Sequence, residues 1–426
     1  MNVAPRTRLN YKQALAWLYG LQRFGIKLGL ENIRRLLDEC CSGVCVKHQA
    51  LAAASASTPK VIHVAGTNGK GSVCAMIDSI CRAQGYHTGL FISPHLVTFR
   101  ERIRVNGEMI SGDAVADGLT MIRDLVADWD PHPTFFEVTT ALALKHFGDA
   151  KIEIAILETG LGGRLDATNA VQSDVSVITP IGLDHEMWLG HTLAEIAGEK
   201  AGIIKPAVPV VSAPQRAEAE QVIRARATEC GSPVQFVNET YHRSPVALRG
   251  EYQKQNGAVA IAAIHAANFD VKERAIVRGL AGIEWPARFQ KWDERTIIDG
   301  AHNPGAARIL AQTWREVFGD HKATLVLAVL SDKDLRAICE ALAPIAAAVL
   351  LPKIRSERGA DPEGLSKVLS DITPSLPCSI TPTVDDALIL ARAKPNPILI
   401  TGSLHFAGEV LAHLRGELAA FEECAQ

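Results

Sequence analysis

A glycine-rich stretch between an apolar run and a helical pattern carries the residue types that bind phosphate. Residues 61–65, VIHVA, predict a short buried strand, and residues 72–80, SVCAMIDSI, predict a helix. Between them lie Gly66, Thr67, Asn68, Gly69, Lys70, Gly71 and Ser72. Glycines let consecutive backbone N–H groups point at one anion, and the helix N-terminus adds unpaired N–H groups. The stretch therefore predicts a nucleotide site in which Lys70 contacts the phosphates and Ser72 can face a metal ion.

The loop nevertheless departs from the common phosphate-binding pattern. Val64 stands where the first glycine is expected, and Gly71 separates Lys70 from Ser72. The alternative is a tight turn between strand and helix with a solvated lysine. We favour the nucleotide site because the glycines, the lysine and the serine all fall at the single strand–helix junction where they would contact phosphate.

Three polar side chains fall at or just after the C-terminal ends of predicted strands. They are Ser93, Glu158 and His185. In open α/β sheets ligands bind at this edge. Oxygen ligands suit Mg²⁺, and an imidazole can join them when water completes the octahedron. Taken singly, each residue has an ordinary alternative, as a turn residue, a strand-end carboxylate or a hydrogen-bonded loop histidine.

Short apolar runs alternate with helical patterns along the first two thirds of the chain. After a helical region at 11–37, which Gly25 and Gly29 interrupt, and a low-complexity connector at 49–59, the runs follow residues 61–65 at 88–93, 152–158, 174–179 and 208–213. Continuous apolar strands that alternate with helices predict a parallel sheet covered on both faces.

A second series of the same kind follows the sequence WPARFQKW at 285–292. Its apolar runs are at 296–299, 323–330, 347–352 and 397–401. We therefore expect an α/β chain with two domains: a P-loop-type ATP-binding domain at 1–284, a hinge at 285–292, and a smaller Rossmann-like domain at 293–426.

Composition limits the classes of function. The chain has 426 residues, of which 47% are hydrophobic and 21% charged, so it can bury the cores of two globular domains. The net charge of −3 gives no basic surplus for nucleic acid or an anionic membrane. Residues 1–20 lack the apolar core of a signal peptide, and no uncharged apolar run is long enough to span a membrane. We expect a cytoplasmic protein.

Nine cysteines, an odd number, are typical of reduced thiols. Cys40, Cys41, Cys45 and His48 lie close together in the sequence, and a zinc site would need four such ligands. Their spacing matches no common zinc motif, so ordinary thiols are the favoured interpretation.

AGTNGKGS at 65–72 resembles the phosphate loop of the folylpolyglutamate synthase and dihydrofolate synthase family, within the Mur ligase superfamily. Further motifs of that family match in order: SPHL at 93–96, RERIRVNG at 100–107, LETGLGGRLDATN at 157–169, GLDHEMWLGHTLAEIAGEKAGIIK at 182–205, QKQN at 253–256, WPARFQ at 285–290, IDGAHNP at 298–304 and TGSLHFAGEV at 401–410. The resemblance implies a ligase that uses ATP and Mg²⁺ to add L-glutamate to a pterin-containing acid through an acyl phosphate. Similarity to the bacterial form with two activities implies dihydropteroate and reduced folates as substrates.

The resemblance also implies roles for the polar residues. Ser93, Glu158 and His185 would hold Mg²⁺, with Glu158 shared between two ions, and a K⁺ ion is compatible with the site. Lys200 would be carbamylated, which replaces a positive charge next to the metal by a carboxylate; the alternative is a lysine on a helix surface. Lys70, Glu158, His185 and Lys200 would be the catalytic residues. Asn256, Arg288 and Asp299 would complete the ATP site.

The pterin end is implied at TFFE, which is Thr134, Phe135, Phe136 and Glu137, and at Leu165, Asp166 and Ala167. Phe135 and Phe136 could stack on a flat heterocycle, with core packing as the alternative. Residues 22–24 could add to this pocket. Lys333 and Arg358 carry no specific signal and are expected to be surface charges. His405 stands where some members have Tyr or Phe, and its role stays open, as does that of the Ala/Ser-rich segment before the loop.

Three rival functions remain. A Mur ligase acting on a nucleotide-sugar peptide would need a further N-terminal domain, for which the roughly sixty residues before the loop leave little room. A P-loop kinase or ATPase would not need the GGRLDATN and DGAHNP stretches. A catalytically inactive binding module would not need the complete set of metal and loop residues. The sequence leaves open whether both ligase activities occur, the preferred folate and glutamate-chain length, and the oligomeric state, for which we expect a monomer.

Overall fold

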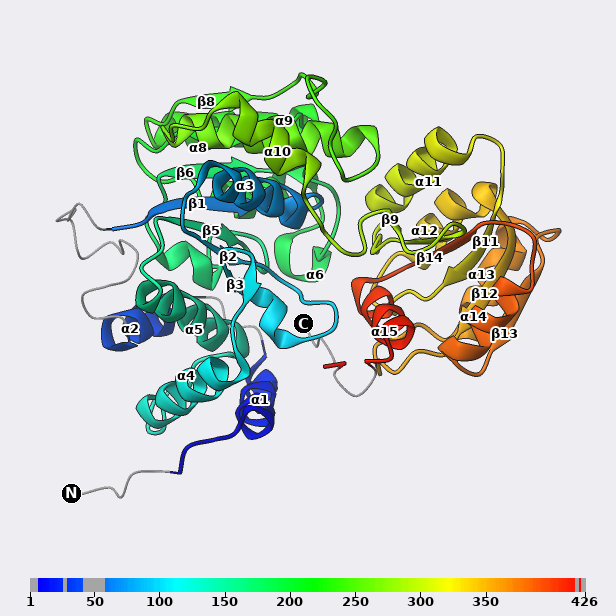
Figure 1. Ribbon diagram of the computed structural model, residues 1–426, viewed down its shortest axis with the longest axis horizontal. Coiled ribbons are helices and arrows are strands. Elements are labelled where there is room, and N and C mark those ends of the chain that lie inside the picture. The colour runs from blue at the N-terminus through cyan, green and yellow to red at the C-terminus, as the bar shows by residue number, and fades with distance from the viewer. Residues whose placement is uncertain (1–6, 26–28, 41–57, 418–420, 423–426) are drawn as a thin grey trace.

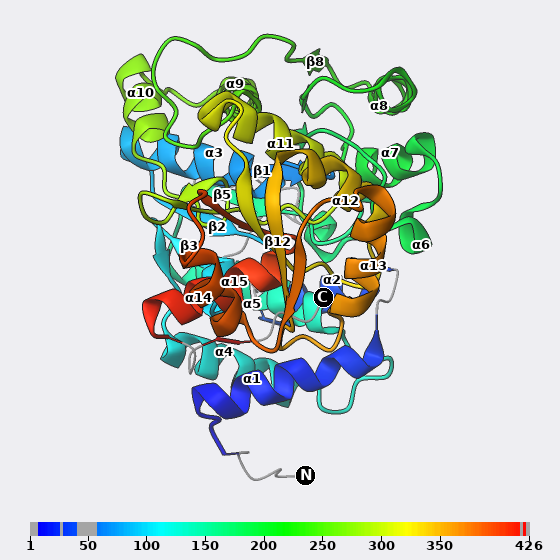
Figure 2. The ribbon, with the colours of Figure 1, turned by 90° about the vertical axis from the view of Figure 1, so that its right-hand side faces the viewer.

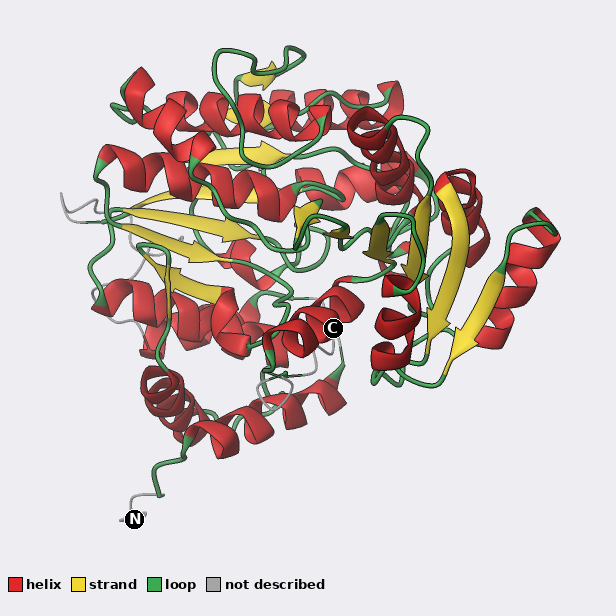
Figure 3. Ribbon diagram, turned by 45° about the vertical axis from the view of Figure 1, so that its right-hand side comes forward, coloured by secondary structure: helices red, strands yellow, loops and turns green. Residues whose placement is uncertain are grey.

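The structure, a computed structural model, describes residues 7–25, 29–40, 58–417 and 421–422. Its strands form two separate sheets, which lie beside each other in Figure 1. The α/β architecture expected from the sequence is confirmed. Most neighbouring strands in both sheets are parallel, and helices cover them (Figure 3).

The first sheet has eight strands in the order β4-β3-β2-β5-β1-β6-β7-β8. Strands β2, β5, β1, β6, β7 and β8 run parallel, whereas β3 and β4 form an antiparallel hairpin at one edge. The bounds are β1 Lys60–Ala65, β2 Thr88–Phe91, β3 Ile103–Val105, β4 Glu108–Met109, β5 Ile154–Glu158, β6 Val175–Ile178, β7 Val210–Ser212 and β8 Val234–Phe236.

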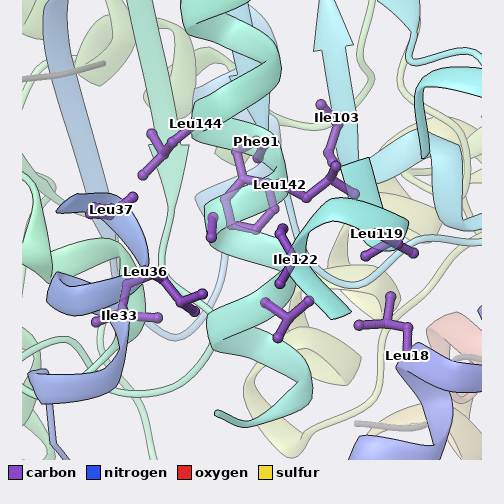
Figure 4. Packing of buried hydrophobic residues seen from close by; sticks show 14 of the residues in the cluster. Leu18, Ile33, Leu36, Leu37, Phe91, Ile103, Leu119, Ile122, Leu142 and Leu144 are labelled. Atoms are coloured by element: carbon purple, nitrogen blue, oxygen red, sulfur yellow. The ribbon is translucent and has the colours of Figure 1, made fainter. Parts of the chain in front are cut away.

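Helices cover both faces of this sheet. They are α1 Tyr11–Gly20, α2 Glu31–Cys40, α3 Lys70–Gln84, α4 Gly112–Leu125, α5 Phe135–Asp149, α6 Glu186–Leu189, α7 Leu193–Ala201, α8 Ala217–Glu229, α9 Glu251–Ala266 and α10 Glu273–Ala281. Short 3₁₀ helices are η1 Leu21–Phe24, η2 Phe99–Arg102 and η3 Ala167–Ala170. Side chains alternate along the strands: Val61 packs with α1, α2, α4 and α5, whereas Ile62 packs with α3, α9 and α10. Figure 4 shows part of the first core.

The second sheet has six strands in the order β13-β12-β11-β14-β10-β9. Its strands are β9 Gln290–Lys291, which is antiparallel, β10 Thr296–Ile298, β11 Ala323–Leu327, β12 Ala346–Pro352, β13 Cys378–Thr381 and β14 Ile398–Thr401. One face packs against α11 Pro304–Phe318, α12 Leu335–Leu342, η4 Ala343–Ile345 and α13 Pro362–Ile372. The other packs against α14 Val384–Arg392 and α15 Leu404–Arg415, as Figure 2 shows.

Two features of the sequence fall wholly or partly outside the described residues. Cys41, Cys45 and His48 lie outside the described residues, and so does most of the Ala/Ser-rich segment at 49–59. Within the described ranges the cysteines are free thiols, and no three His, Cys, Asp or Glu side chains gather as a metal site. No helix in that part of the chain is long and apolar enough to cross a bilayer.

Candidate active site in the cleft between the two sheets

The glycine-rich stretch forms the turn between β1 and α3 that the sequence predicted, although the helix begins at Lys70, two residues earlier than expected. Gly66 has a φ of 149°, and an added Cβ there would lie 1.9 Å from the side-chain oxygen of Thr179. Lys70 folds back over the turn, where its Nζ donates to the carbonyl oxygens of Gly66 at 3.2 Å and Thr67 at 3.4 Å. These contacts hold the ammonium group over the loop, where a phosphate would bind.

Ser93 and Glu158 meet at the C-terminal edge of the first sheet. The backbone N–H of Ser93 donates to Glu158 Oε2 at 3.2 Å. Ser93 Oγ is buried and has no hydrogen-bond partner among the described residues. Burial raises the pKa of Glu158, and the charge of Lys70 partly offsets this effect. A buried hydroxyl without a partner next to a buried carboxylate fits a hard cation such as Mg²⁺.

His185 lines the same cavity as Ser93 and Glu158. Its backbone has a φ of 53°, and it precedes α6 directly. Desolvation lowers the pKa of His185 to about 4, despite the opposing charge of Asp184. The imidazole is therefore neutral at pH 7, which is the form that binds a metal ion.

Lys200 is not a surface lysine. It lies in the last turn of α7 with 5% of its surface exposed, and its Nζ donates to the Gly66 carbonyl at 2.8 Å. Burial, reinforced by the charge of Lys70, lowers the pKa of Lys200 to about 7. A lysine in this state holds a substantial fraction of neutral amine at physiological pH, and neutral amine is the form that reacts with carbon dioxide.

The residues expected to bind ATP surround one cavity of about 410 Å³. Its lining includes Thr67, Asn68, Gly69, Lys70, Gly71, Ser72, Ser93, Glu158, His185, Lys200, Asn256, Arg288 and Asp299. Asp299, whose carboxylate is buried, accepts from the backbone N–H groups of Phe289 at 2.7 Å and Ala301 at 2.8 Å. The second sheet thus contributes residues to the cavity that contains the phosphate loop.

A larger cavity, of about 1070 Å³, contains the expected pterin residues. Phe135 stacks on Tyr19 with ring centroids 5.6 Å apart and belongs to the core, but it also lines the cavity. Core packing and contact with a heterocycle therefore both apply to it. Phe136 packs over Gly160, where an added Cβ would lie 2.5 Å from the ring. Gln22 also lines this cavity, which agrees with an N-terminal contribution.

The polar members of the expected pterin set also have local structural roles. Thr134 and Glu137 form the capping box of α5. Asp166 accepts four hydrogen bonds: from the backbone N–H groups of Gly160 and Leu161, and from the N–H and hydroxyl of Thr168. Four bonds are the usual capacity of a carboxylate, so Asp166 shapes the loop beside the cavity. Leu165 and Ala167 line the cavity next to it.

The expectation that Lys333 is a surface charge is wrong. Its side chain is 8% exposed, and Nζ lies 2.8 Å from Asp184 Oδ1, which comes from the first sheet's side of the cleft. Burial alone would raise the pKa of Asp184, but His302, His185 and Lys333 hold that pKa below its usual value. Arg358 is 42% exposed and pairs with Asp332 at 2.9 Å, but it also lines both cavities, so it is a partly exposed residue of the cleft and not only a surface charge.

Further residues in the cleft were not identified from the sequence. Asn303 donates to Asp184 at 3.0 Å and to Asn68 in the phosphate loop at 3.0 Å, and Asn68 donates back at 3.3 Å. His405, whose role the sequence left open, is 7% exposed, and neither ring nitrogen has a partner among the described residues. Asn303 lies in the IDGAHNP motif at the start of α11, and that motif was the available signal for it.

Comparisons with known proteins agree with this geometry. Residues 64–211 match the Mur ligase middle domain, and residues 287–404 match the Mur ligase glutamate ligase domain. The dihydrofolate synthase/folylpolyglutamate synthase of Bacillus subtilis (strain 168) is 33% identical, with 95% of this chain and 99% of the relative covered.

Solved structures give the same result. E. coli FolC in complex with DHPP and ADP has a TM-score of 0.83 at 31% identity, covering 96% of this chain and 99% of that one. A bifunctional folylpolyglutamate synthase/dihydrofolate synthase with Mn, AMPPNP and L-glutamate bound has a TM-score of 0.81 at 30% identity, covering 96% and 100%. The members of the dihydrofolate synthase/folylpolyglutamate synthase family, one branch of the Mur ligases, are ATP-dependent ligases that form carbon–nitrogen bonds in folate metabolism, and this chain belongs to that family.

Proposed function

We propose that this chain has both activities: it adds L-glutamate to dihydropteroate, giving dihydrofolate, and to the γ-carboxylate of reduced folates, giving folylpolyglutamates. One observation carries the proposal. The smaller cavity, with the phosphate loop, and the larger, mostly apolar cavity share Asn68, Gly160, Asp184 and His185 in their linings. An acid whose pterin lies in the larger cavity can thus present its carboxylate to ATP in the smaller one.

The reaction needs an activated carboxylate, because a carboxylate ion is a poor electrophile. Its oxygen attacks the γ-phosphorus of ATP, so that an acyl phosphate forms and ADP leaves. The amine of glutamate then attacks the acyl carbon, loses a proton, and phosphate leaves as the amide forms. Both steps depend mainly on positioning and on neutralising charge, which is the chemistry that a two-sided cleft provides.

Each residue has a role in this scheme. Lys70 and the backbone N–H groups of residues 66–72 would bind the β- and γ-phosphates, and Asn256, Arg288 and Asp299 would complete the ATP site. Ser93, Glu158 and His185 would hold Mg²⁺, which supplies charge neutralisation when bound. We propose that two Mg²⁺ ions would bind here, with Glu158 shared between them, and that a K⁺ ion is compatible with the site. One solved relative has Mn bound, which supports a divalent cation in this family.

Lys200 would act as a carbamate. Its ammonium form would repel the cation held by Ser93 and Glu158, whereas the carbamate supplies a negative charge at the same position. The burial of Lys200 and the lowering of its pKa to about 7 support this proposal.

Thr134, Phe135, Phe136, Glu137, Leu165, Asp166 and Ala167 would surround the pterin. Phe136 is the residue we expect to stack on it, since Phe135 is largely occupied in the core. We further propose that residues 1–284 and 293–426 are the two domains, joined by a hinge at 285–292, and that the protein is a cytoplasmic monomer with neither nucleic acid nor a membrane as partner.

A paired assay tests the two activities. Purified protein, ATP, Mg²⁺ and L-glutamate are mixed with dihydropteroate in one tube and tetrahydrofolate in the other, and ADP release and the mass of the acid are followed. We expect both acids to gain a glutamyl unit. Gain in one tube only would reduce the proposal to a single activity. ADP release that does not depend on glutamate, with no gain in mass, would contradict the proposal and favour a plain ATPase.

A further inference from the structure

A segment of the first domain is embedded in the second. Residues 95–99 connect the loop of Ser93 to η2, and Val97 is 3% exposed within the core that Ile298, Phe406 and Val410 of the second domain form. Figure 1 shows α15 on the side of the second domain that faces the first. The core of the second domain therefore packs around the chain only four residues after Ser93, at Val97.

Helix α15 packs against this segment without room for a side chain. A Cβ added to Gly408 would lie 2.0 Å from the carbonyl oxygen of Leu96 and 2.7 Å from its carbonyl carbon. Backbone atoms at that distance cannot move aside cheaply, so glycine allows the helix to approach Leu96 directly. Leu96 is three residues from Ser93.

Glu422, near the C-terminal end of the chain, also holds residues 97–99, through hydrogen bonds of its side chain and backbone. Glu422 Oε2 accepts from Phe99 N at 2.5 Å, Thr98 Oγ1 at 3.2 Å and Tyr11 Oη at 3.2 Å. Its backbone N–H donates to Val97 O at 2.8 Å. One residue of the second domain's C-terminal segment thus binds three consecutive residues of the first domain.

A second connection leads from Glu422 toward the larger cavity. The backbone oxygen of Glu422 accepts from His95 Nε2 at 3.0 Å. His95 Nδ1 accepts from Arg102 Nε at 2.9 Å, which fixes the tautomer of the ring. The guanidinium of Arg102 lies over the ring of Phe135, 5.4 Å from its centroid. The two contacts thus lead to residues that line the cleft: Ser93 lines the smaller cavity and Phe135 the larger one.

We propose that residues 95–99, Gly408 and Glu422 form an interdomain joint, and that Glu422 is a positioning residue which sets Ser93 for metal binding. The proposal deepens the proposed function and rests on it. Because the joint holds the backbone at 95–99 from two sides, a change on either side displaces Ser93 relative to Glu158, its hydrogen-bond partner. Residues that orient a metal ligand typically change metal affinity when they are altered.

Two independent changes test the joint. Glu422→Ala removes the carboxylate that accepts from Phe99 and Thr98, whereas Gly408→Ala adds a methyl group that would clash with the Leu96 carbonyl. We expect each to weaken Mn²⁺ binding about tenfold, since changes behind a metal ligand usually cost that much or more. Binding is measured with AMPPNP present, from the electron paramagnetic resonance signal of free Mn²⁺. In Glu422→Gln we expect recovery of most of the parent affinity, because the amide oxygen still accepts from Phe99 N and from one of the two hydroxyl groups, and the Tyr11 and Thr98 hydroxyls can also bond each other.

Matched controls separate positioning from stability. Glu417, five residues earlier, is exposed, and Gly364 in α13 has no atom closer than 3.9 Å to an added Cβ. Glu417→Ala and Gly364→Ala should therefore leave Mn²⁺ affinity unchanged.

Mn²⁺ affinity within twofold of the parent in both Glu422→Ala and Gly408→Ala would overturn the joint's role at the metal site, whatever their Tm. If Glu422→Ala does not fold, Gly408→Ala decides alone: weaker Mn²⁺ binding supports the joint, and affinity within twofold of the parent overturns it. A parent that binds Mn²⁺ but never ligates glutamate would instead contradict the proposed function.

Discussion

Lys200→Ala is expected to lower kcat for glutamate ligation by about a hundredfold or more, at the upper end of what the loss of a group next to a metal usually costs. The buried amine lies 2.8 Å from the Gly66 carbonyl, at the base of the phosphate loop, so its carbamate would face the cation from a fixed position. Excess bicarbonate should not restore the rate, because alanine has no amine to modify. The measurement is glutamate-dependent ADP release at saturating substrates.

A spectroscopic measurement separates the carbamate from a structural role. With ¹³C-labelled bicarbonate, the parent should show a carbamate carbon resonance that Lys200→Ala lacks. Lys205→Ala is the control, since Lys205 is also buried with a pKa lowered to about 8 but donates to Asn169 O, outside both cavities. A full rate in Lys200→Ala would contradict the proposed role.

The same lysine gives a pH dependence with a definite sign. The pKa of Lys200 is about 7 in the folded chain, against the ordinary lysine value of 10.5 that applies when the chain is unfolded. Between these values the unfolded chain binds more protons, so the unmodified protein gains stability as the pH rises through this window. Below pH 7 the amine is protonated and cannot take up carbon dioxide, so carbamylation and activity should fall together.

Glu158→Gln is expected to weaken Mn²⁺ binding about a hundredfold and to lower kcat by a similar factor, since a buried divalent ion would lose its carboxylate ligand. Without metal, the effect on stability has the opposite sign. Burial raises the pKa of Glu158, which shows that the charged form is disfavoured there, and a neutral amide of the same shape removes that cost. The Tm without metal should stay the same or rise.

Thermal unfolding with and without Mn²⁺ and AMPPNP measures both effects at once. The parent should gain Tm from the bound cation by mass action, and Glu158→Gln should not. Glu153→Gln is the control, because Glu153 is exposed before β5 and accepts a hydrogen bond from His87 N. A Mn²⁺-dependent Tm gain in Glu158→Gln equal to that of the parent would contradict the assignment of Glu158 to the metal.

Sequence patterns within a short stretch predicted the phosphate loop and the buried strands. The turn from 66 to 72 and the strands at 60–65, 154–158 and 175–178 follow from glycine content and apolar runs. Strands β3, β4 and β8 were not predicted, because most of their side chains are half-buried or exposed and they carry no apolar run, whereas the equally short β7 and β10 are buried and do.

Contacts across the cleft could not be predicted in this way. Lys333 and Asp184 are 149 positions apart, and each is a plain charged residue in its own segment. Only the packing of the two sheets brings them together and buries the lysine. Asp166 shows the converse: the motif marks it as a site residue, but only the structure shows that its four hydrogen bonds are already used to shape the loop.

The central claim is that ATP activates the carboxylate of the acid in this cleft, and isotope transfer tests it most directly. Dihydropteroate labelled with ¹⁸O in its carboxylate is mixed with the protein, ATP, Mg²⁺ and L-glutamate, and the released phosphate is examined by mass spectrometry. We predict one labelled oxygen in each phosphate, because the carboxylate oxygen that attacks the γ-phosphorus leaves with it. Amide formation accompanied by unlabelled phosphate would contradict this mechanism.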